Sequence, residues 1–88
     1  MKRHVLSVFD SASQLYGQPM FVPSIGGAVR SFGDECNRKS DDNALYMHPE
    51  DFELRSLAVF DDESGQFFAP SDGVGFVVAR GKDQRSVS

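Results

Sequence analysis

Apolar and polar residues divide the chain into short strand-like segments around one amphipathic stretch. β-Branched and aromatic residues are dense over residues 3–9, and apolar runs recur at 19–22, 52–60, 66–69 and 74–79. Such runs, when bounded by Gly, Pro, Asp or Ser, are typical of β-strands. We therefore expect about five strands, separated by polar loops such as residues 10–17.

One segment has helical rather than strand spacing. Its apolar positions form a single stripe, made of Ile25, Ala28, Val29, Phe32 and Cys36. Ser24 precedes this stripe, where a side-chain oxygen can accept hydrogen bonds from free backbone N–H groups. Three glycines each weaken the helix by roughly 1 kcal/mol relative to Ala, but they allow close approach to a sheet. The pattern predicts a helix that begins after Ser24.

Three further segments complete the expected organisation. His48-Pro49-Glu50-Asp51-Phe52 predicts a single helical turn, because Pro suits the first position and acids favour a helix N-terminus. Residues 37–43 contain no apolar side chain and indicate a loop. Residues 82–88 are polar, so we expect one domain over residues 1–81 followed by a frayed tail.

Two parts of the chain have similar sequences. Ser7-Val8-Phe9-Asp10 is followed by Gly17-Gln18, as Ala58-Val59-Phe60-Asp61 is followed by Gly65-Gln66. Each copy predicts a strand, a loop that begins at Asp, and a second strand; a true repeat and a coincidence both remain open. The resulting order, β-β-α-β-β-β, predicts an α+β fold: a small antiparallel sheet with one helix packed on one face.

Composition places the chain among small globular domains. Its 88 residues fit one domain, and a 40% hydrophobic content with eight Phe argues against disorder. A single cysteine excludes an intramolecular disulfide and indicates a reducing compartment. Ser7 and Asp10 interrupt the first apolar run, which is too short for a signal peptide, and no run reaches the ~20 residues of a membrane span. We expect a cytoplasmic protein without membrane contact.

Charge is unevenly distributed along the chain. The net charge is −4, which disfavours simple electrostatic binding of nucleic acid. Residues 41–63 contain eight acids and one arginine, a balance of −7, so the remaining residues sum to +3. An acidic middle between basic flanks leaves room for a basic face.

Motifs for metal binding or catalysis are missing from the sequence. His4, Cys36 and His48 are far apart, and no C-x-x-C or H-x-x-x-H pattern is present. The acidic hairpin loop lacks the alternating acids of an EF-hand. Gly26-Gly27 forms neither a dinucleotide fingerprint nor a P-loop. We expect no metal, no cofactor and no enzymatic activity.

Nucleic-acid binding has some support. Phe67 and Phe68 are adjacent in a predicted strand, so they point to opposite faces and one is left for solvent or a partner. Proteins that bind single strands combine aromatic rings with cations along the backbone path. The candidate binding residues are Arg30, Arg38, Lys39, Arg80, Phe67 and Phe68. The alternative is a solubilising surface in which one of the two rings lies in a homodimer contact.

Several segments, in their order and spacing, resemble the small nonstructural protein of gokushoviruses, microviruses (Microviridae) of the chlamydia-phage type in which it is the fifth-ORF product. The matching segments are Val5-Leu6-Ser7-Val8-Phe9-Asp10, Tyr16-Gly17-Gln18-Pro19-Met20-Phe21-Val22-Pro23, Ala28-Val29-Arg30-Ser31-Phe32 and Tyr46-Met47-His48-Pro49-Glu50-Asp51-Phe52-Glu53-Leu54. The resemblance covers roughly residues 4–70.

This resemblance implies a nonstructural protein of a single-stranded DNA bacteriophage, made in the host cytoplasm during infection. It implies a role in viral DNA replication, or in the switch to single-strand synthesis and packaging, through binding of single-stranded DNA or of replication and packaging proteins. It carries over no catalytic residue, and we expect a homodimer. The alternative is an assembly or host-interaction protein that binds no DNA, scaffold-like and homo-oligomeric.

Overall fold

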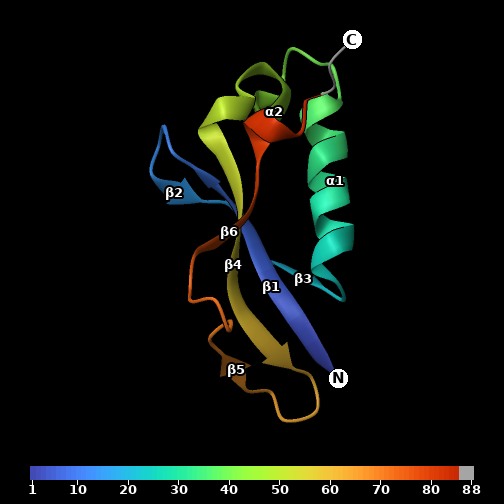
Figure 1. The fold of residues 1–88 in the computed structure, drawn as a ribbon, viewed down its shortest axis with the longest axis vertical. Coiled ribbons are helices and arrows are strands. Elements are labelled where there is room, and N and C mark those ends of the chain that lie inside the picture. Colours follow the sequence, from blue (N-terminus) through green and yellow to red (C-terminus); the bar gives the residue numbers. More distant parts are fainter. Residues whose placement is uncertain (86–88) are drawn as a thin grey trace.

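Two long antiparallel strands form the centre of the molecule (Figure 1). The computed structural model describes residues 1–85, in which β1 (Lys2–Asp10) pairs along its whole length with β4 (Phe52–Asp61). Four short strands complete the sheet: β2 (Leu15–Tyr16) and β3 (Met20–Val22) beside β1, and β5 (Phe67–Phe68) and β6 (Phe76–Arg80) beside β4. The predicted α+β fold with an antiparallel sheet is therefore confirmed.

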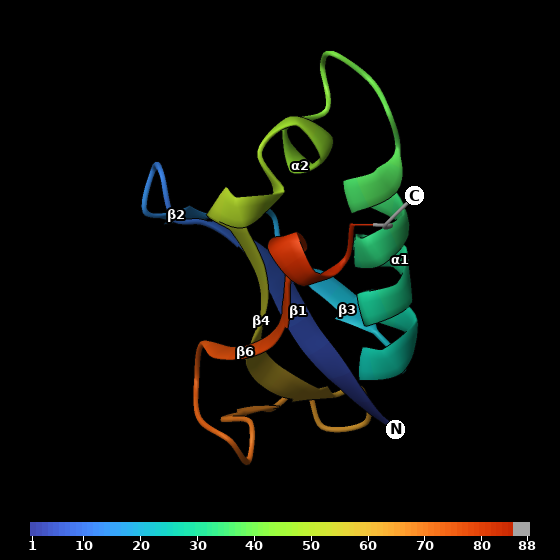
Figure 2. The same ribbon diagram turned by 45° about the horizontal axis from the view of Figure 1, so that its top comes forward.

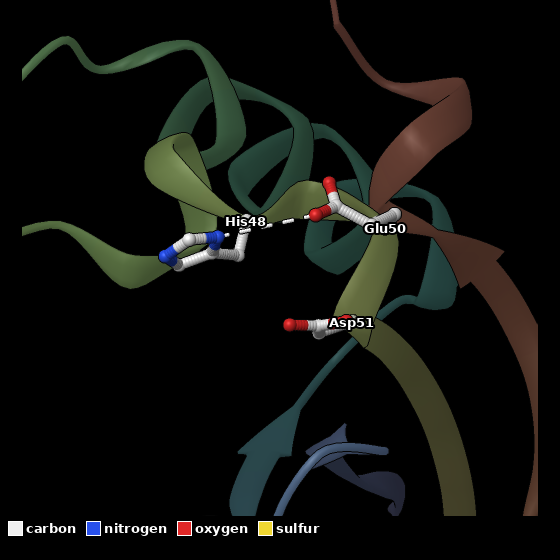
Figure 3. A group of neighbouring side chains, drawn as sticks. All are labelled: His48, Glu50 and Asp51. Carbon is white, nitrogen blue, oxygen red and sulfur yellow. Dashed lines mark ion pairs between the residues drawn. The ribbon is translucent and has the colours of Figure 1, made fainter.

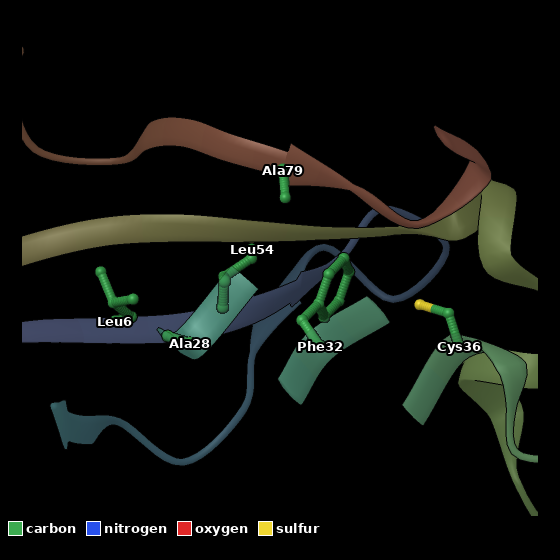
Figure 4. Packing of buried hydrophobic residues seen from close by; sticks show 6 residues of the cluster. All are labelled: Leu6, Ala28, Phe32, Cys36, Leu54 and Ala79. Atoms are coloured by element: carbon green, nitrogen blue, oxygen red, sulfur yellow. The ribbon is translucent and has the colours of Figure 1, made fainter. Parts of the chain in front are cut away.

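The helix α1 (Ile25–Asn37) covers one face of this sheet, as expected. The Ser24 hydroxyl accepts a hydrogen bond from the Gly27 N–H at 3.1 Å, which confirms the predicted cap. Figure 4 shows the packing beneath the helix, where three of its side chains meet three from the strands: Ala28, Phe32 and Cys36 with Leu6, Leu54 and Ala79. The apolar stripe of the helix sequence is therefore the face that α1 buries, and this burial of apolar surface stabilises the fold.

The element order is β-β-β-α-β-β-β, with one strand more than predicted. The additional strand is β2, which lies inside the expected loop and has only two residues, too few for an alternating pattern. A short helix, α2 (Ala44–Met47), also follows the charged loop. Buried Asn43 connects the two helices, because its side chain donates to the carbonyl oxygens of Glu35 and Arg38. No helix in residues 1–85 is long and apolar enough to cross a membrane.

Both long strands end in the same kind of turn, at opposite ends of the sheet. The Asp10 carbonyl accepts from the Gln14 N–H, and the Asp61 carbonyl from the Gly65 N–H, each at 2.8 Å. The last residue of each turn has a positive φ, 63° at Gln14 and 75° at Gly65. The internal sequence similarity therefore corresponds to two matching turns. Gln14, rather than Gly17, is the structural counterpart of Gly65.

Residues after β6 fold back against the helices. η2 (Gly81–Asp83) is a 3₁₀ turn, and the carbonyl of Gln84 beyond it accepts from the Asn37 side chain at 2.7 Å. The Arg85 guanidinium donates to the Tyr46 carbonyl at 2.8 Å and lies over the Tyr46 ring. These contacts connect the end of the described chain to α1 and α2.

The expected frayed tail therefore differs from the structure over residues 82–85. Composition indicated fraying because these residues are polar, but their partners are backbone and side-chain groups far away in sequence. Such partners leave no local pattern. The remainder of the expected tail, residues 86–88, lies outside the described residues.

Gly81 lies directly against the backbone of η1 (Pro49–Asp51), the predicted helical turn. A Cβ at this position would overlap the Pro49 carbonyl oxygen and lie 3.1 Å from the Phe52 carbonyl oxygen. Because both are backbone atoms, the junction must shift to admit a methyl group. We expect Gly81→Ala to lower the free energy of unfolding by about 1–3 kcal/mol in urea denaturation.

The matched control for this substitution is Gly26→Ala, since Gly26 lies in α1 with nothing within 4 Å of an added Cβ. We expect it to raise stability by up to about 1 kcal/mol, because alanine favours the helical backbone. Equal effects of the two substitutions would contradict close packing at Gly81.

Cys36 has no exposed surface and lies at the end of the core cluster. Burial raises the pKa of its thiol, so little reactive thiolate is present at neutral pH. We expect native protein at pH 8 to react with an aromatic disulfide reagent only at the rate of unfolding, whereas denatured protein reacts at once. Rapid labelling of the native protein would show that this end of the core is open.

Candidate nucleic-acid interface

The sheet face opposite α1 has a distinct set of side chains. Leu6 and Leu54 point towards α1, so their strand neighbours Val5, Ser7 and Arg55 point the other way, because successive side chains alternate. Cross-strand pairing extends this face over every strand. We call it the open face: Arg3, Val5, Ser7, Phe9, Tyr16, Phe21, Glu53, Arg55, Ala58, Phe60, Phe67, Val77 and Arg80. Figures 1 and 2 show α1 on one side of the long strands and the β2 hairpin projecting on the other.

Three phenylalanine rings meet at one end of the open face. Phe60 of β4 lies between Phe21 of β3 and Phe67 of β5, with ring centroids 5.4 and 4.8 Å away. Phe21 and Phe67 remain 48% and 59% exposed, although each already contacts two other rings. We call this the phenylalanine cluster. It is an apolar platform with ring surface still available to a ligand.

The other end of the open face contains arginine stacked on aromatic rings. The Arg55 guanidinium lies 3.9 Å from the centroid of Phe9, and the Tyr16 ring is 4.8 Å from Phe9. Arg55 donates to the Tyr16 hydroxyl at 3.0 Å and, through Nε and Nη2, to Glu53 at 3.1 and 2.7 Å. Arg80 approaches the second Glu53 oxygen at 3.6 Å. We call these five residues the arginine cluster.

Arg55 is held in a fixed orientation by these contacts. The pKa of Arg55 is raised by its hydrogen bonds to the Tyr16 hydroxyl and then to Glu53, so its charge is secure. A guanidinium has five N–H donors, and the three hydrogen bonds occupy three of them. The remaining donors suit a phosphate or a base edge, which arginine recognises in a planar geometry.

Small side chains separate the two clusters. Val5 and Ser7 are buried although they belong to the open face. The Ser7 hydroxyl donates to the Gly17 carbonyl at 2.8 Å, which satisfies its hydrogen bonding within the protein. The side chains of Val5 and Ser7 therefore offer a ligand almost no surface, and the exposed side chains of the open face lie at its two clusters.

The open face is less acidic than the rest of the chain. Three arginines, Arg3, Arg55 and Arg80, face one carboxylate, Glu53, and Asp62 lies at the edge, 3.4 Å from Arg3. Three cations against two acids leave the face at +1, compared with −4 for the whole chain. The open face is therefore not acidic, although residues 41–63 of the sequence are.

Only two of the residues singled out from the sequence lie on the open face. Phe67 and Arg80 lie on the open face, at its two ends. Arg30, Arg38 and Lys39 lie on or just after α1, in the other layer, and Arg38 is paired with Glu35 at 2.6 Å. Phe68 also points to the α1 side, where Lys2 lies over its ring, so the expected opposition of the two rings is observed.

Sequence reasoning missed most of the open face. Tyr16, Phe21, Phe60 and Arg55 were not singled out, although each lies in or beside an expected strand. The available signal was strand alternation, which relates Phe60 to Ala58. It could not show which face α1 covers, and that choice decides exposure.

The His48-Pro49-Glu50-Asp51 turn gathers three potential metal ligands (Figure 3). One ligand atom of each of His48, Glu50 and Asp51 lies within 4.8 Å of the others, and His48 is 3.9 Å from Glu50. His48 and Glu50 are exposed. The backbone carbonyl of Asp51 accepts two hydrogen bonds, from the N–H and from the hydroxyl of Ser11. The turn thereby connects to the β1–β2 hairpin, and we assign it a structural role.

An apolar pocket of about 420 Å³ lies between α1 and β3. Its walls include Val22, Phe32 and Leu45, with Glu35 as its one charged lining residue. Glu35 is paired with Arg38, which holds the pKa of its carboxyl below the usual range. The pocket therefore suits an apolar group, whereas the open face suits an aromatic and anionic one.

Comparison with known proteins places the chain in a family. A family model described as Phage ORF5 protein matches residues 3–78, a span that includes β1 from its second residue, α1, and the β4–β5 hairpin. No curated protein and no solved structure matches the chain. Because the match extends over most of the sequence, the chain is a bacteriophage protein that belongs to the Phage ORF5 protein family.

Proposed function

We propose that the protein binds single-stranded DNA through the open face, in viral DNA replication or in the switch to single-strand synthesis and packaging. The observation that carries this proposal is the combination of exposed phenylalanine rings with three arginines on a sheet face that no helix of residues 1–85 covers. Stacking of bases on aromatic side chains, with cations beside the backbone, is the usual basis of single-strand binding.

A single strand suits this surface better than a duplex does. Phe21 and Phe67 of the phenylalanine cluster keep exposed ring surface, and only unpaired bases can present their faces to it. Duplex binding depends more heavily on cations, because phosphate contacts dominate its affinity. A chain with a net charge of −4 has few to offer.

The sequence resemblance to the small nonstructural protein of gokushoviruses supports the same role. Such a protein acts in the host cytoplasm during synthesis of the single-stranded genome, where unpaired DNA is abundant. No step of this proposal needs a catalytic group or a cofactor, and we propose that the protein is not an enzyme.

The proposal is tested by fluorescence anisotropy with a labelled single-stranded oligonucleotide and with its duplex as control. We expect micromolar binding of the single strand and weaker binding of the duplex. With two or three phosphate contacts, the logarithm of the binding constant should fall with the logarithm of salt concentration with a slope of about −1.4 to −2.1. Affinity then falls roughly tenfold from 50 to 200 mM salt. Absence of salt-sensitive binding at micromolar protein would rule out direct DNA binding.

A second candidate function is assembly or host interaction without DNA binding. It is favoured by the apolar pocket, which lies beside β3, a strand that pairs only with β1 among the described strands. A partner strand added to this edge could place an apolar side chain in the pocket. Co-purification from infected cells distinguishes the two: this candidate predicts capsid or host protein without viral replicase or DNA.

We also propose a homodimer through the edge of β5, which pairs only with β4 in the described chain. An unpaired strand edge with aromatic neighbours is a natural place for a second copy to add. Such a contact is compatible with DNA binding, because it uses backbone groups at the edge of the sheet. Sedimentation velocity tests it, and a monomer at tens of micromolar would contradict it.

A further inference from the structure

We infer that the open face takes a short single strand of about six nucleotides, which runs from the phenylalanine cluster to the arginine cluster. This inference rests on the proposed function, because it concerns the same surface. It adds the length of the ligand, the chemistry expected at each end, and the reason why a longer strand gains no further contact.

The length follows from the spacing of the clusters along β1. Arg3 is the cross-strand partner of Phe60 in the phenylalanine cluster, and Phe9 belongs to the arginine cluster. Six residues of strand separate them, which is about 20 Å at the usual rise per residue. Nucleotides advance about 3.4 Å each along one strand of duplex DNA, so roughly six span this distance in a single strand that keeps the same base stacking.

The two ends offer different chemistry to the strand. The phenylalanine cluster presents exposed ring surface, and the nearest cation of the open face is Arg3. The arginine cluster presents remaining guanidinium donors of Arg55 together with the half-exposed Arg80. We therefore assign base stacking to the first end and phosphate or base-edge binding to the second.

Carboxylates lie beyond both clusters. Asp61 ends β4 and the turn after it contains Asp62 and Glu63, next to the phenylalanine cluster. The N-terminal ammonium pairs with Asp62 at 2.8 Å and with Glu63 at 3.2 Å, and Arg3 pairs with Asp62 at 3.4 Å. At the other end, Asp10 ends β1. The N–H of the next residue, Ser11, donates a hydrogen bond to the backbone carbonyl of Asp51, which is beside Glu50. A DNA backbone that extends past the arginine cluster would approach like charges, which costs free energy. Past the phenylalanine cluster it would meet cations that are already paired with carboxylates, so it gains no free cation there. The acids therefore set an upper limit on the binding site.

The test uses labelled oligothymidylates of 3, 6, 9 and 12 nucleotides in anisotropy titrations. We expect at least a fivefold gain in affinity from 3 to 6 nucleotides, because the longer strand reaches both clusters. A 12-nucleotide strand can place a six-nucleotide site at seven positions, which we call registers. From 6 to 12 nucleotides we therefore expect affinity to rise by at most sevenfold. Intrinsic affinity per register should stay constant over this range.

Phe67→Ala provides the decisive variant, with Phe68→Ala as its matched control. Loss of the Phe67 ring should reduce the gain from 3 to 6 nucleotides, whereas Phe68→Ala should leave it unchanged. Intrinsic affinity that continues to rise beyond 6 nucleotides, or a full gain in Phe67→Ala, would overturn the inference while the proposed function stands. Absence of binding at every length would overturn both. Circular dichroism confirms that both variants are folded.

Discussion

Phe67→Ala should weaken binding of a single-stranded 12-nucleotide DNA by roughly 5- to 150-fold. Alanine substitution of a ring that stacks on a base typically costs about 1–3 kcal/mol. Phe67 is the most exposed ring of the phenylalanine cluster, so the substitution removes contact area for the ligand with little loss of protein packing. Fluorescence anisotropy at fixed salt measures the change.

The neighbouring residue gives an unusually close control. Phe68 has the same side chain and lies in the same strand, but it points to the α1 side, with Lys2 over its ring. Phe68→Ala should therefore leave DNA affinity within about twofold of the original protein. If both substitutions weaken binding equally, the effect comes from disruption of β5, and the open face is not the binding surface.

Leu54→Ala should lower the free energy of unfolding by about 2–5 kcal/mol, the largest effect on stability that we expect from one substitution. Leu54 is fully buried in the first half of β4, in one cluster with Phe32 of α1 and Leu6 of β1. Truncation loses buried apolar surface and leaves a cavity between the helix and the sheet. The total free energy of unfolding of a native protein is only about 5–15 kcal/mol.

Leu15→Ala is the matched control for this prediction, since Leu15 is 67% exposed in β2. We expect a change within about 0.5 kcal/mol for that surface substitution. Urea denaturation with a common slope for all variants gives both values. A loss below 1 kcal/mol for Leu54→Ala would show that the core is looser than its packing indicates.

Local patterns made much of the fold predictable. The α1 stripe, the Ser24 cap and the Pro49 turn each depend on residues close together in sequence, and each is observed as expected. The positive φ at Gly65 likewise follows from a short-range turn rule. In these places local preference and tertiary structure agree.

The candidate site was less predictable because it depends on register. The pairing of β1 with β4 shifts by one residue between Val5 and Leu6, and that of β4 with β6 shifts between Leu54 and Arg55. Each irregularity changes which side chains share a face, and no sequence pattern shows it. In the sequence, Arg55 is one cation within an acidic stretch. In the structure, its guanidinium is stacked on the Phe9 ring.

The pairing of β1 with β4 also bears on the order in which the protein folds. Lys2 pairs with Asp61 and Asp10 with Phe52, so the central ladder joins the beginning of the chain to its second half. Contacts between such distant segments form slowly, because a long loop must close before any of them stabilises it. During synthesis on the ribosome, β1 and α1 must therefore wait for β4 to emerge. We expect the nascent chain to expose its apolar stripe until then, which makes this interval the time of greatest aggregation risk.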